Sequence, residues 1–254
     1  MRRAVTAIAV LGALVAGCGS DDEEQTGEGE PRLVVSAASS MTEALTACAK
    51  NYPDAELKLQ FAGSDELAAQ IRQGVKPDVF AAANTRLPEE LNAEGLLSKP
   101  VVFATNEFVL AVREDSAIAG LKDLTAEDVQ IAIGSESVPI GEYTRESLAK
   151  LPAALEEGIL ANVRSNEPDV KGIIGKLTQG AADAGFVYVT DVNATDGALE
   201  ALELPATLEP QATYGAGVVA GAREPEAARA FVDGLVDGPC ADALRDAGFG
   251  APAG

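Results

Sequence analysis

The sequence predicts an α/β fold in which mainly parallel sheets carry helices on both faces. Two observations support this fold class. Short apolar runs alternate with segments of helical periodicity throughout the chain after residue 31, and Gly or Pro residues punctuate this alternation. At 254 residues, the chain is also long enough for one large domain or two modest lobes with buried cores.

The individual elements follow from the period of the apolar residues, which is two in a strand and about 3.6 in a helix. The first part of the fold is predicted to contain strands at 32–38, 55–63 and 77–84, and helices at 41–52, 64–74 and 87–97. Next come a strand at 107–114, a short helix and a strand within 121–134, and a helix at 141–151. Residues 167–192 are predicted to contain a helix and then a strand at 184–189. The order ends with a strand at 212–221 and one or two helices at 224–248.

The N-terminus has the pattern of an export signal. Arg2 and Arg3 precede an apolar stretch at 4–16, which is too short for a stable membrane span, so residues 1–17 are predicted to be a signal peptide. The sequence LVAGC resembles a bacterial lipobox, which makes Cys18 the expected lipidation site; the alternative is an ordinary signal followed by a stray cysteine. Residues 18–31 are acidic and poor in apolar residues, and we expect a disordered tether there. The mature protein is thus expected outside the cytoplasm, lipid-anchored to the outer face of the cell membrane.

Composition narrows the function. The formal net charge of −21 makes nucleic acid an unsuitable partner. The chain contains no histidine, which removes Ser-His-Asp and Cys-His catalysis and the commonest ligand of zinc and copper. A Ser-Lys hydrolase stays conceivable, but there is no G-x-S-x-G elbow, and we do not expect an enzyme. Cys48 and Cys240 would meet an oxidising compartment, so they are candidates for a disulfide, with two separate buried thiols as the alternative.

Four turns place Ser, Gly or Pro at the start of a predicted helix: Ser39-Ser40, Gly63-Ser64, residues 139–141 and residues 166–170. Each turn alone is explained by helix capping, and Ser40 with Glu43 fits a capping box. Together they point to a ligand, because helices of open α/β sheets begin at the carboxyl ends of strands, where their N–H groups favour anions. Tyr188, at a strand end, is a candidate third hydroxyl, or else a core aromatic residue.

Four stretches carry a family resemblance: AASSMTEAL, FAGSDELAAQIRQGVKPDVFAAAN, SVPIGEYTRESL and ADAGFVYVTD. In order and spacing they resemble the molybdate-binding receptors of ABC importers, over nearly all of residues 32–249. The resemblance implies a two-lobed, type II periplasmic-binding-protein fold with the ligand in the cleft between the lobes. Lobe I would comprise 32–105 and 212–254, and lobe II 106–211.

The same resemblance implies the site. Molybdate, and with it tungstate, would be held by Ser40, Ser64, Ile140, Val170 and Tyr188, through hydroxyl groups and backbone N–H groups. The metal would be bound only as the oxyanion, with no direct metal ligand and no cofactor. The protein would be a monomer that delivers its ligand to an ABC permease in the membrane.

Two positions depart from the family pattern. Ile140 stands where a small residue is usual, which a backbone donor tolerates. Asp65 follows Ser64 where serine or glycine is usual. If its carboxylate faced the cleft, it would repel a fully ionised anion but could accept a proton from hydrogen phosphate; we expect it to point away instead, as an acid of the first helical turn. Molybdate, tungstate and sulfate only accept hydrogen bonds, so a shell of donors suits them, whereas phosphate also needs an acceptor. Sulfate, phosphate or an organic anion in the same fold is the alternative, and iron-binding relatives are disfavoured because only Tyr188 lies in a matching motif.

Overall fold

The computed structural model describes residues 30–208 and 210–252. The predicted signal peptide, the lipidation candidate Cys18 and most of the predicted tether lie outside these ranges. Within them, no helix combines the length and the apolar character that crossing a membrane requires.

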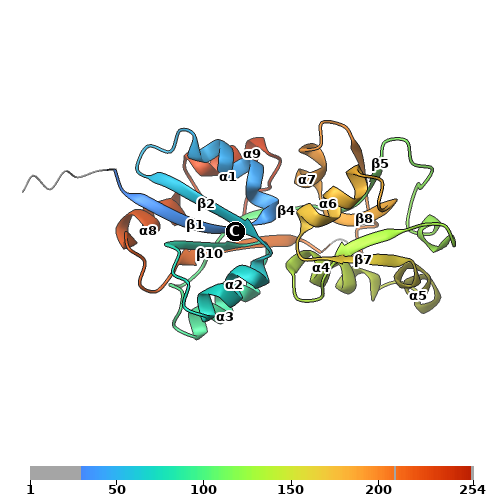
Figure 1. The fold of residues 1–254 in the computed structure, drawn as a ribbon, viewed down its shortest axis with the longest axis horizontal. Helices are drawn as coiled ribbons and strands as arrows, with labels where there is room; N and C mark the ends of the chain where they lie inside the picture. Colours follow the sequence, from blue (N-terminus) through green and yellow to red (C-terminus); the bar gives the residue numbers. More distant parts are fainter. Residues whose placement is uncertain (1–29, 209, 253–254) are drawn as a thin grey trace, which may run out of the picture.

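The described residues form two lobes that lie side by side, each built on a five-stranded sheet (Figure 1). The sheet of lobe I has the order β2-β1-β3-β10-β4. Its strands are β1 (Arg32–Ala38), β2 (Glu56–Ala62), β3 (Val79–Ala82), β4 (Val101–Asn106) and β10 (Ala212–Val218). The sheet of lobe II has the order β7-β6-β8-β5-β9. Its strands are β5 (Phe108–Arg113), β6 (Ile131–Gly134), β7 (Val163–Glu167), β8 (Ala184–Tyr188) and β9 (Leu199–Leu202).

Helices cover both faces of each sheet, as the α/β pattern predicts (Figure 1). Lobe I carries the short 3₁₀ helix η1 (Ser39–Met41) and the helices α1 (Thr42–Ala49), α2 (Ser64–Arg72), α3 (Arg86–Ala93), α8 (Pro225–Gly234) and α9 (Pro239–Asp246). Lobe II carries η2 (Asp123–Thr125), α4 (Pro139–Leu148), α5 (Ala153–Ala161), α6 (Val170–Thr178) and α7 (Val189–Asn193). The core strands β3, β6 and β8 are buried along their whole length, which explains their continuous apolar sequences.

Each sheet is mixed, so the predicted parallel core is only part of it. β1 pairs in parallel with β2 and β3, and β6 pairs in parallel with β7 and β8. β10 is antiparallel to β3 and β4, and β5 is antiparallel to β8 and β9. The antiparallel strands arise where the chain passes between the lobes: β4 and β5 are separated only by Glu107, and the chain returns from β9 in lobe II to β10 in lobe I.

The two ends of the fold meet in lobe I. A disulfide joins Cys48 of α1 to Cys240 of α9, with a Cα–Cα distance of 5.0 Å. Cys48 is 4 % and Cys240 0 % exposed, so the bond lies inside the packing between the two helices. It closes a loop of 192 residues that includes all of lobe II.

Candidate functional site

A narrow cavity of about 10 Å³ lies between the lobes, where the ends of strands meet the starts of helices. All five residues predicted as ligand positions line it: Ser40, Ser64, Ile140, Val170 and Tyr188. Their side chains come from both lobes, and each residue is between 1 % and 4 % exposed. This volume is far below the 300–1,000 Å³ typical of drug-sized ligands, so the site suits only a small ligand.

Ser40 lies in η1, directly after β1, and its hydroxyl does not cap a helix. Neither η1 nor α1 has a side-chain cap, so the capping box with Glu43 is not formed and that interpretation is wrong. Instead, the Oγ of Ser40 is 2.9 Å from the hydroxyl of Tyr214 in β10. The second explanation for this serine, that it faces a ligand, agrees with its place in the cavity wall.

Ser64 is the first residue of α2, and Gly63 rather than Ser64 occupies the N-cap position. The Oγ of Ser64 accepts a hydrogen bond of 3.1 Å from the backbone N–H of Ala83, just after β3. A hydroxyl has one hydrogen to donate, and this contact does not use it. The Ser64 hydroxyl is therefore available as a donor toward the cavity that the residue lines.

Ile140 and Val170 bring two helix N-termini to the cavity. They lie in the first turns of α4 and α6, where backbone N–H groups have no partner within the helix and carry partial positive charge. Asp169 is the N-cap of α6, and its carboxylate accepts a 3.0 Å bond from Gly172 N–H. Gly141 allows α4 to start close to the end of β6, since a Cβ there would lie 1.8 Å from the carbonyl oxygen of Ser135.

Tyr188 ends β8, and its hydroxyl is buried without a hydrogen-bond partner among the described residues. An unpartnered buried hydroxyl costs about 1–3 kcal/mol, so its place in a cavity wall indicates a ligand that accepts from it. Burial, with a smaller contribution from the neighbouring Tyr214, raises the pKa of Tyr188 well above its ordinary value. The group thus keeps its proton and can act as a donor.

Contacts between the lobes close the cleft around this cavity. Lys171 of α6 lies 2.7 Å from Glu43 of α1, and Arg86 of α3 lies 2.5 Å from Glu142 of α4. Asp65 is absent from the cavity wall, and its Oδ2 accepts a 2.5 Å bond from the Ser137 hydroxyl of the other lobe. These pairs are partly exposed, so each ion pair contributes only about 0–1 kcal/mol, but together they favour the closed arrangement.

Lys171, the cation nearest in sequence to the residues that line the cavity, already pairs with two carboxylates. Lys171 follows Val170 directly, and its ammonium also lies 3.1 Å from the buried carboxylate of Asp191 in α7. Burial alone lowers the pKa of Lys171, but the carboxylates of Asp191 and Glu43 outweigh it, so the pKa is raised and the charge persists. Burial raises the pKa of Asp191 to about 7, and Lys171 offsets this only in part.

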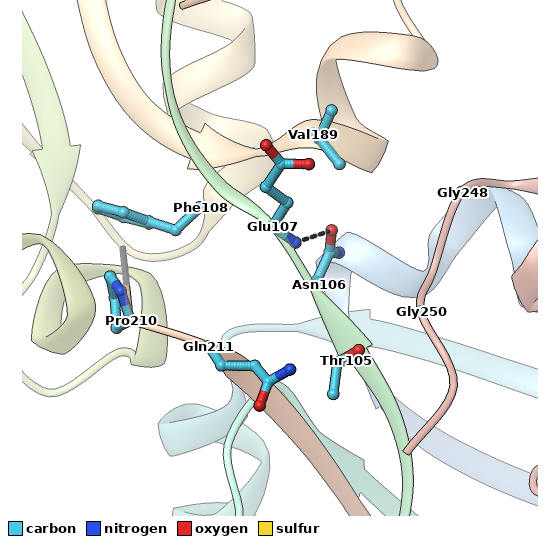
Figure 2. A pocket seen from close by; sticks show the side chains of 9 residues that line it. All are labelled: Thr105, Asn106, Glu107, Phe108, Val189, Pro210, Gln211, Gly248 and Gly250. Atoms are coloured by element: carbon cyan, nitrogen blue, oxygen red, sulfur yellow. Dashed lines mark hydrogen bonds between the residues drawn. The ribbon is translucent and has the colours of Figure 1, made fainter. Parts of the chain in front are cut away.

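Two further features bear on alternative sites. A wider cavity of about 350 Å³ lies where the chain crosses between the lobes, beside Glu107 and Gln211 (Figure 2). Its wall contains no serine, and none of the five predicted ligand residues lines it. Among residues 30–208 and 210–252, no cluster of three or more acidic or cysteine side chains forms a metal site.

One S-x-x-K stretch, from Ser147 to Lys150, bears on the hydrolase alternative. The Ser147 hydroxyl is buried and donates a 2.6 Å bond to the Leu208 carbonyl, while Lys150 is exposed beyond the end of α4. No hydrogen bond joins the two side chains in the described structure, so they do not form a Ser-Lys dyad.

Sequence reasoning missed Tyr214 and Asn106, which stand behind the cavity wall. Tyr214 was part of a predicted strand, and its hydroxyl reaches Ser40 from a position 174 residues along the chain. Asn106, at the end of β4, donates from Nδ2 to Tyr214 at 3.3 Å and to Thr190 at 2.8 Å. No local motif marks either residue, because the contact exists only once β10 has paired in the sheet.

Comparisons with known proteins identify the family and agree with the two-lobed fold. Residues 33–250 match the family model described as bacterial extracellular solute-binding protein. The chain is 31 % identical to the molybdate-binding protein ModA of Mycobacterium tuberculosis, over 98 % of this chain and 96 % of that protein. It is also 31 % identical to the putative ABC transporter substrate-binding lipoprotein YvgL of Bacillus subtilis, over 94 % of each chain. The solved periplasmic molybdate-binding protein of Azotobacter vinelandii has a TM-score of 0.78 at 20 % identity, covering 87 % of this chain and 100 % of that one.

Proposed function

Because the chain belongs to the family of bacterial extracellular solute-binding proteins, we propose that it captures molybdate, and also tungstate, outside the cytoplasm and delivers it to an ABC importer. The relatives that are molybdate-binding proteins support this ligand. The observation that carries the proposal is the cavity in which Ser40, Ser64 and Tyr188 meet the first turns of α4 and α6.

The chemistry of the cavity wall supports a fully ionised tetrahedral anion. The hydroxyls of Ser64 and Tyr188 retain hydrogens to donate, and the N–H groups of Ile140 and Val170 add two more donors. Molybdate presents only acceptor oxygens, so every such contact is a charge-assisted hydrogen bond worth about 1.5–3 kcal/mol. Several of these in a closed cleft are enough for micromolar binding or better without a counter-charge.

Calorimetric titration of the purified protein tests the ligand. Molybdate and tungstate should bind tightly, while sulfate and phosphate should bind weakly or not at all. Equal affinity for sulfate would remove the molybdate assignment and favour the sulfate alternative. Tight binding of phosphate would show that an acceptor in the wall, such as the Asp169 carboxylate, reaches the ligand.

Ser64→Ala and Ser40→Ala test the site itself. Each should weaken molybdate binding by about 1–3 kcal/mol while the unfolding transition of the free protein stays cooperative. Unchanged affinity in both variants would place the ligand elsewhere.

We propose in addition that Cys18 carries a lipid that holds the protein at the outer face of the membrane, a proposal supported by the lipoprotein relative. The monomer would open and close about the two crossings near Asn106 and Gln211, which divide lobe I (32–105 and 212–254) from lobe II (106–211). Replacing Cys18 with serine should release the protein from cells into the medium; retention at the membrane would contradict the anchor.

A further inference from the structure

Asp191 is a buried carboxylate near the cavity that the proposed binding chemistry does not use. It lies in the first turn of α7, three residues after Tyr188, and its side chain is 0 % exposed. Its Oδ2 has no hydrogen-bond partner among the described residues. A carboxylate in such a place is costly to keep ionised unless a cation balances its charge.

The cation that balances Asp191 is shared with a second carboxylate. The Lys171 ammonium of α6 lies 3.1 Å from Asp191 Oδ1 and 2.7 Å from Glu43 Oε2 of α1 in the other lobe. One positive charge thus serves two negative charges. Burial raises the pKa of Asp191 to about 7 in spite of Lys171, so near neutral pH a small change in the surroundings decides whether this carboxylate is charged.

The other elements around α7 bring no free cation to Asp191 among the described residues. Tyr188 of β8 and Tyr214 of β10 contribute uncharged hydroxyl groups, since burial above all raises the pKa of each tyrosine well above its ordinary value. Strands β5 and β9 also contact α7, but Arg113 of β5 pairs with other carboxylates and Glu200 of β9 is exposed. Lys171 is therefore the cation on which the charge of Asp191 depends.

The charge of Asp191 acts on the cavity wall. After burial, which has the largest effect, the Asp191 carboxylate is one of the groups that raise the pKa of Tyr188, a wall residue. The interaction of two charged groups is mutual, so a negative charge held against the Tyr188 hydroxyl also acts on Asp191. The described residues that line the cavity include no lysine or arginine, so the wall itself does not neutralise a bound dianion.

We propose that capture of the dianion is coupled to the uptake of one proton, which passes from the solvent to the Asp191 carboxylate. Above about pH 7, Asp191 of the free protein is ionised and pairs with Lys171. The arriving dianion repels this carboxylate in a buried site of low dielectric, so the neutral acid is favoured, and Lys171 keeps its ion pair with Glu43. This inference rests on the proposed function and adds a proton as a second ligand of the same protein.

Calorimetric titration with molybdate, in buffers of different ionisation enthalpy, counts the protons that are taken up. At about pH 8 the count should approach one, and at about pH 5.5 it should approach zero, because Asp191 is then protonated before the ligand arrives. Molybdate affinity should accordingly fall by up to about tenfold per pH unit above pH 7 and level off in acid. The chain has no histidine, so no side chain of ordinary pKa titrates in this range.

Asp191→Asn keeps the size of the side chain and removes its titration. Proton uptake at about pH 8 should vanish, and molybdate affinity should become independent of pH, at or above that of the unaltered protein at about pH 8. Loss of a merely structural side chain would instead lower the affinity at every pH. Infrared difference spectra on adding molybdate should show the carbonyl band of a protonated carboxyl group in the unaltered protein and not in Asp191→Asn.

Glu43→Gln tests the shared cation through a half-exposed side chain, whose replacement leaves the core intact. Besides burial and the opposing effect of Lys171, the charge of Glu43 raises the pKa of Asp191. Without Glu43, the pH range of proton uptake should therefore move to lower pH. Glu142→Gln is the matched control, because Glu142 also pairs across the lobes, with Arg86 instead of Lys171, and it should leave this pH range unchanged.

Three results would overturn the inference and leave molybdate capture intact. They are molybdate binding without proton uptake at about pH 8, uptake that persists in Asp191→Asn, and a pH range of uptake that stays in place in Glu43→Gln. Failure of the unaltered protein to bind either molybdate or tungstate would overturn this inference and the proposed function together.

Discussion

Tyr188→Phe should have opposite effects on the free and the ligand-bound protein. The substitution removes one hydroxyl and keeps the ring that packs at 6.0 Å from Tyr214 and 6.4 Å from Tyr143. No described protein group loses a hydrogen bond, because the hydroxyl has no partner there. The free protein should thus unfold at an unchanged or slightly higher temperature, with a gain of up to about 1 kcal/mol from removing a buried unpaired group.

In the bound state, the same change removes a hydrogen bond to an ionised ligand. Such a bond contributes about 1.5–3 kcal/mol, which corresponds to a dissociation constant about ten to 150 times higher. Calorimetry gives the affinity, and thermal unfolding with and without molybdate gives the two stabilities. Tyr52→Phe is the matched control, because Tyr52 packs on Phe231 and does not line the cavity, and it should leave affinity unchanged. A Tyr188→Phe protein that binds molybdate normally, or that loses stability without ligand, would refute the assignment of this hydroxyl to the anion.

Three further predictions concern closure, protonation and the cross-link. Gly63→Ala places a Cβ 2.4 Å from the Pro168 carbonyl oxygen of the other lobe, so ligand affinity should fall. Thermal unfolding should show that the free protein stays folded. Normal affinity would show that the closed lobes tolerate the methyl group. Burial raises the pKa of Asp191 from 3.8 to about 7. Between these two pH values the native state binds a proton that the unfolded state has lost. The free energy of unfolding should therefore fall as pH rises from about 4 to about 7. Denaturant titrations of Asp191→Asn should show a free energy of unfolding that depends less on pH in that window. An unchanged pH dependence would contradict the assignment of the raised pKa to Asp191. Replacing Cys48 and Cys240 with serine should lower the free energy of unfolding by about 2–5 kcal/mol, a loss that a reducing agent should reproduce in the unaltered protein.

The sequence predicts best those elements whose pattern is local. The strands at the lobe centres and the helices α2, α4, α6 and α8 follow from apolar periodicity, because each shows a buried face within its own residues. β4, α5, β7 and β9 were not predicted. β7 has no fully buried residue, and its polar sequence VRSNE is held by parallel pairing with β6 rather than by a pattern of its own. The mixed sheets were also missed, since strand direction depends on where the chain crosses between lobes.

The candidate site divides in the same way. The serines and helix starts at the cavity stand at strand-to-helix turns, which the sequence marks with small and polar residues. Tyr214 and Asn106 sit inside or at the end of ordinary strands, and their roles depend on contacts across 174 and 108 residues. The capping prediction for Ser40 was wrong because Ser40 lies inside η1 and Met41 holds the N-cap position of α1, whereas Asp169 does cap its helix. Asp65 does not line the cavity, but the expectation that its carboxylate points away from the cleft was wrong, because the carboxylate reaches across to Ser137 of lobe II.

Strand β10 lies between β3 and β4 in lobe I, although its residues, 212–218, follow all of lobe II along the chain. Lobe II is a continuous stretch of chain and can complete its own sheet while residues 212–218 are still being exported. Lobe I, by contrast, lacks its inner strand, its cysteine partner and Tyr214 until the C-terminal residues have emerged. We therefore expect that a chain interrupted before that point, which has the serines of the cavity wall but lacks β10 and the contact of Tyr214 with Ser40, does not bind the anion.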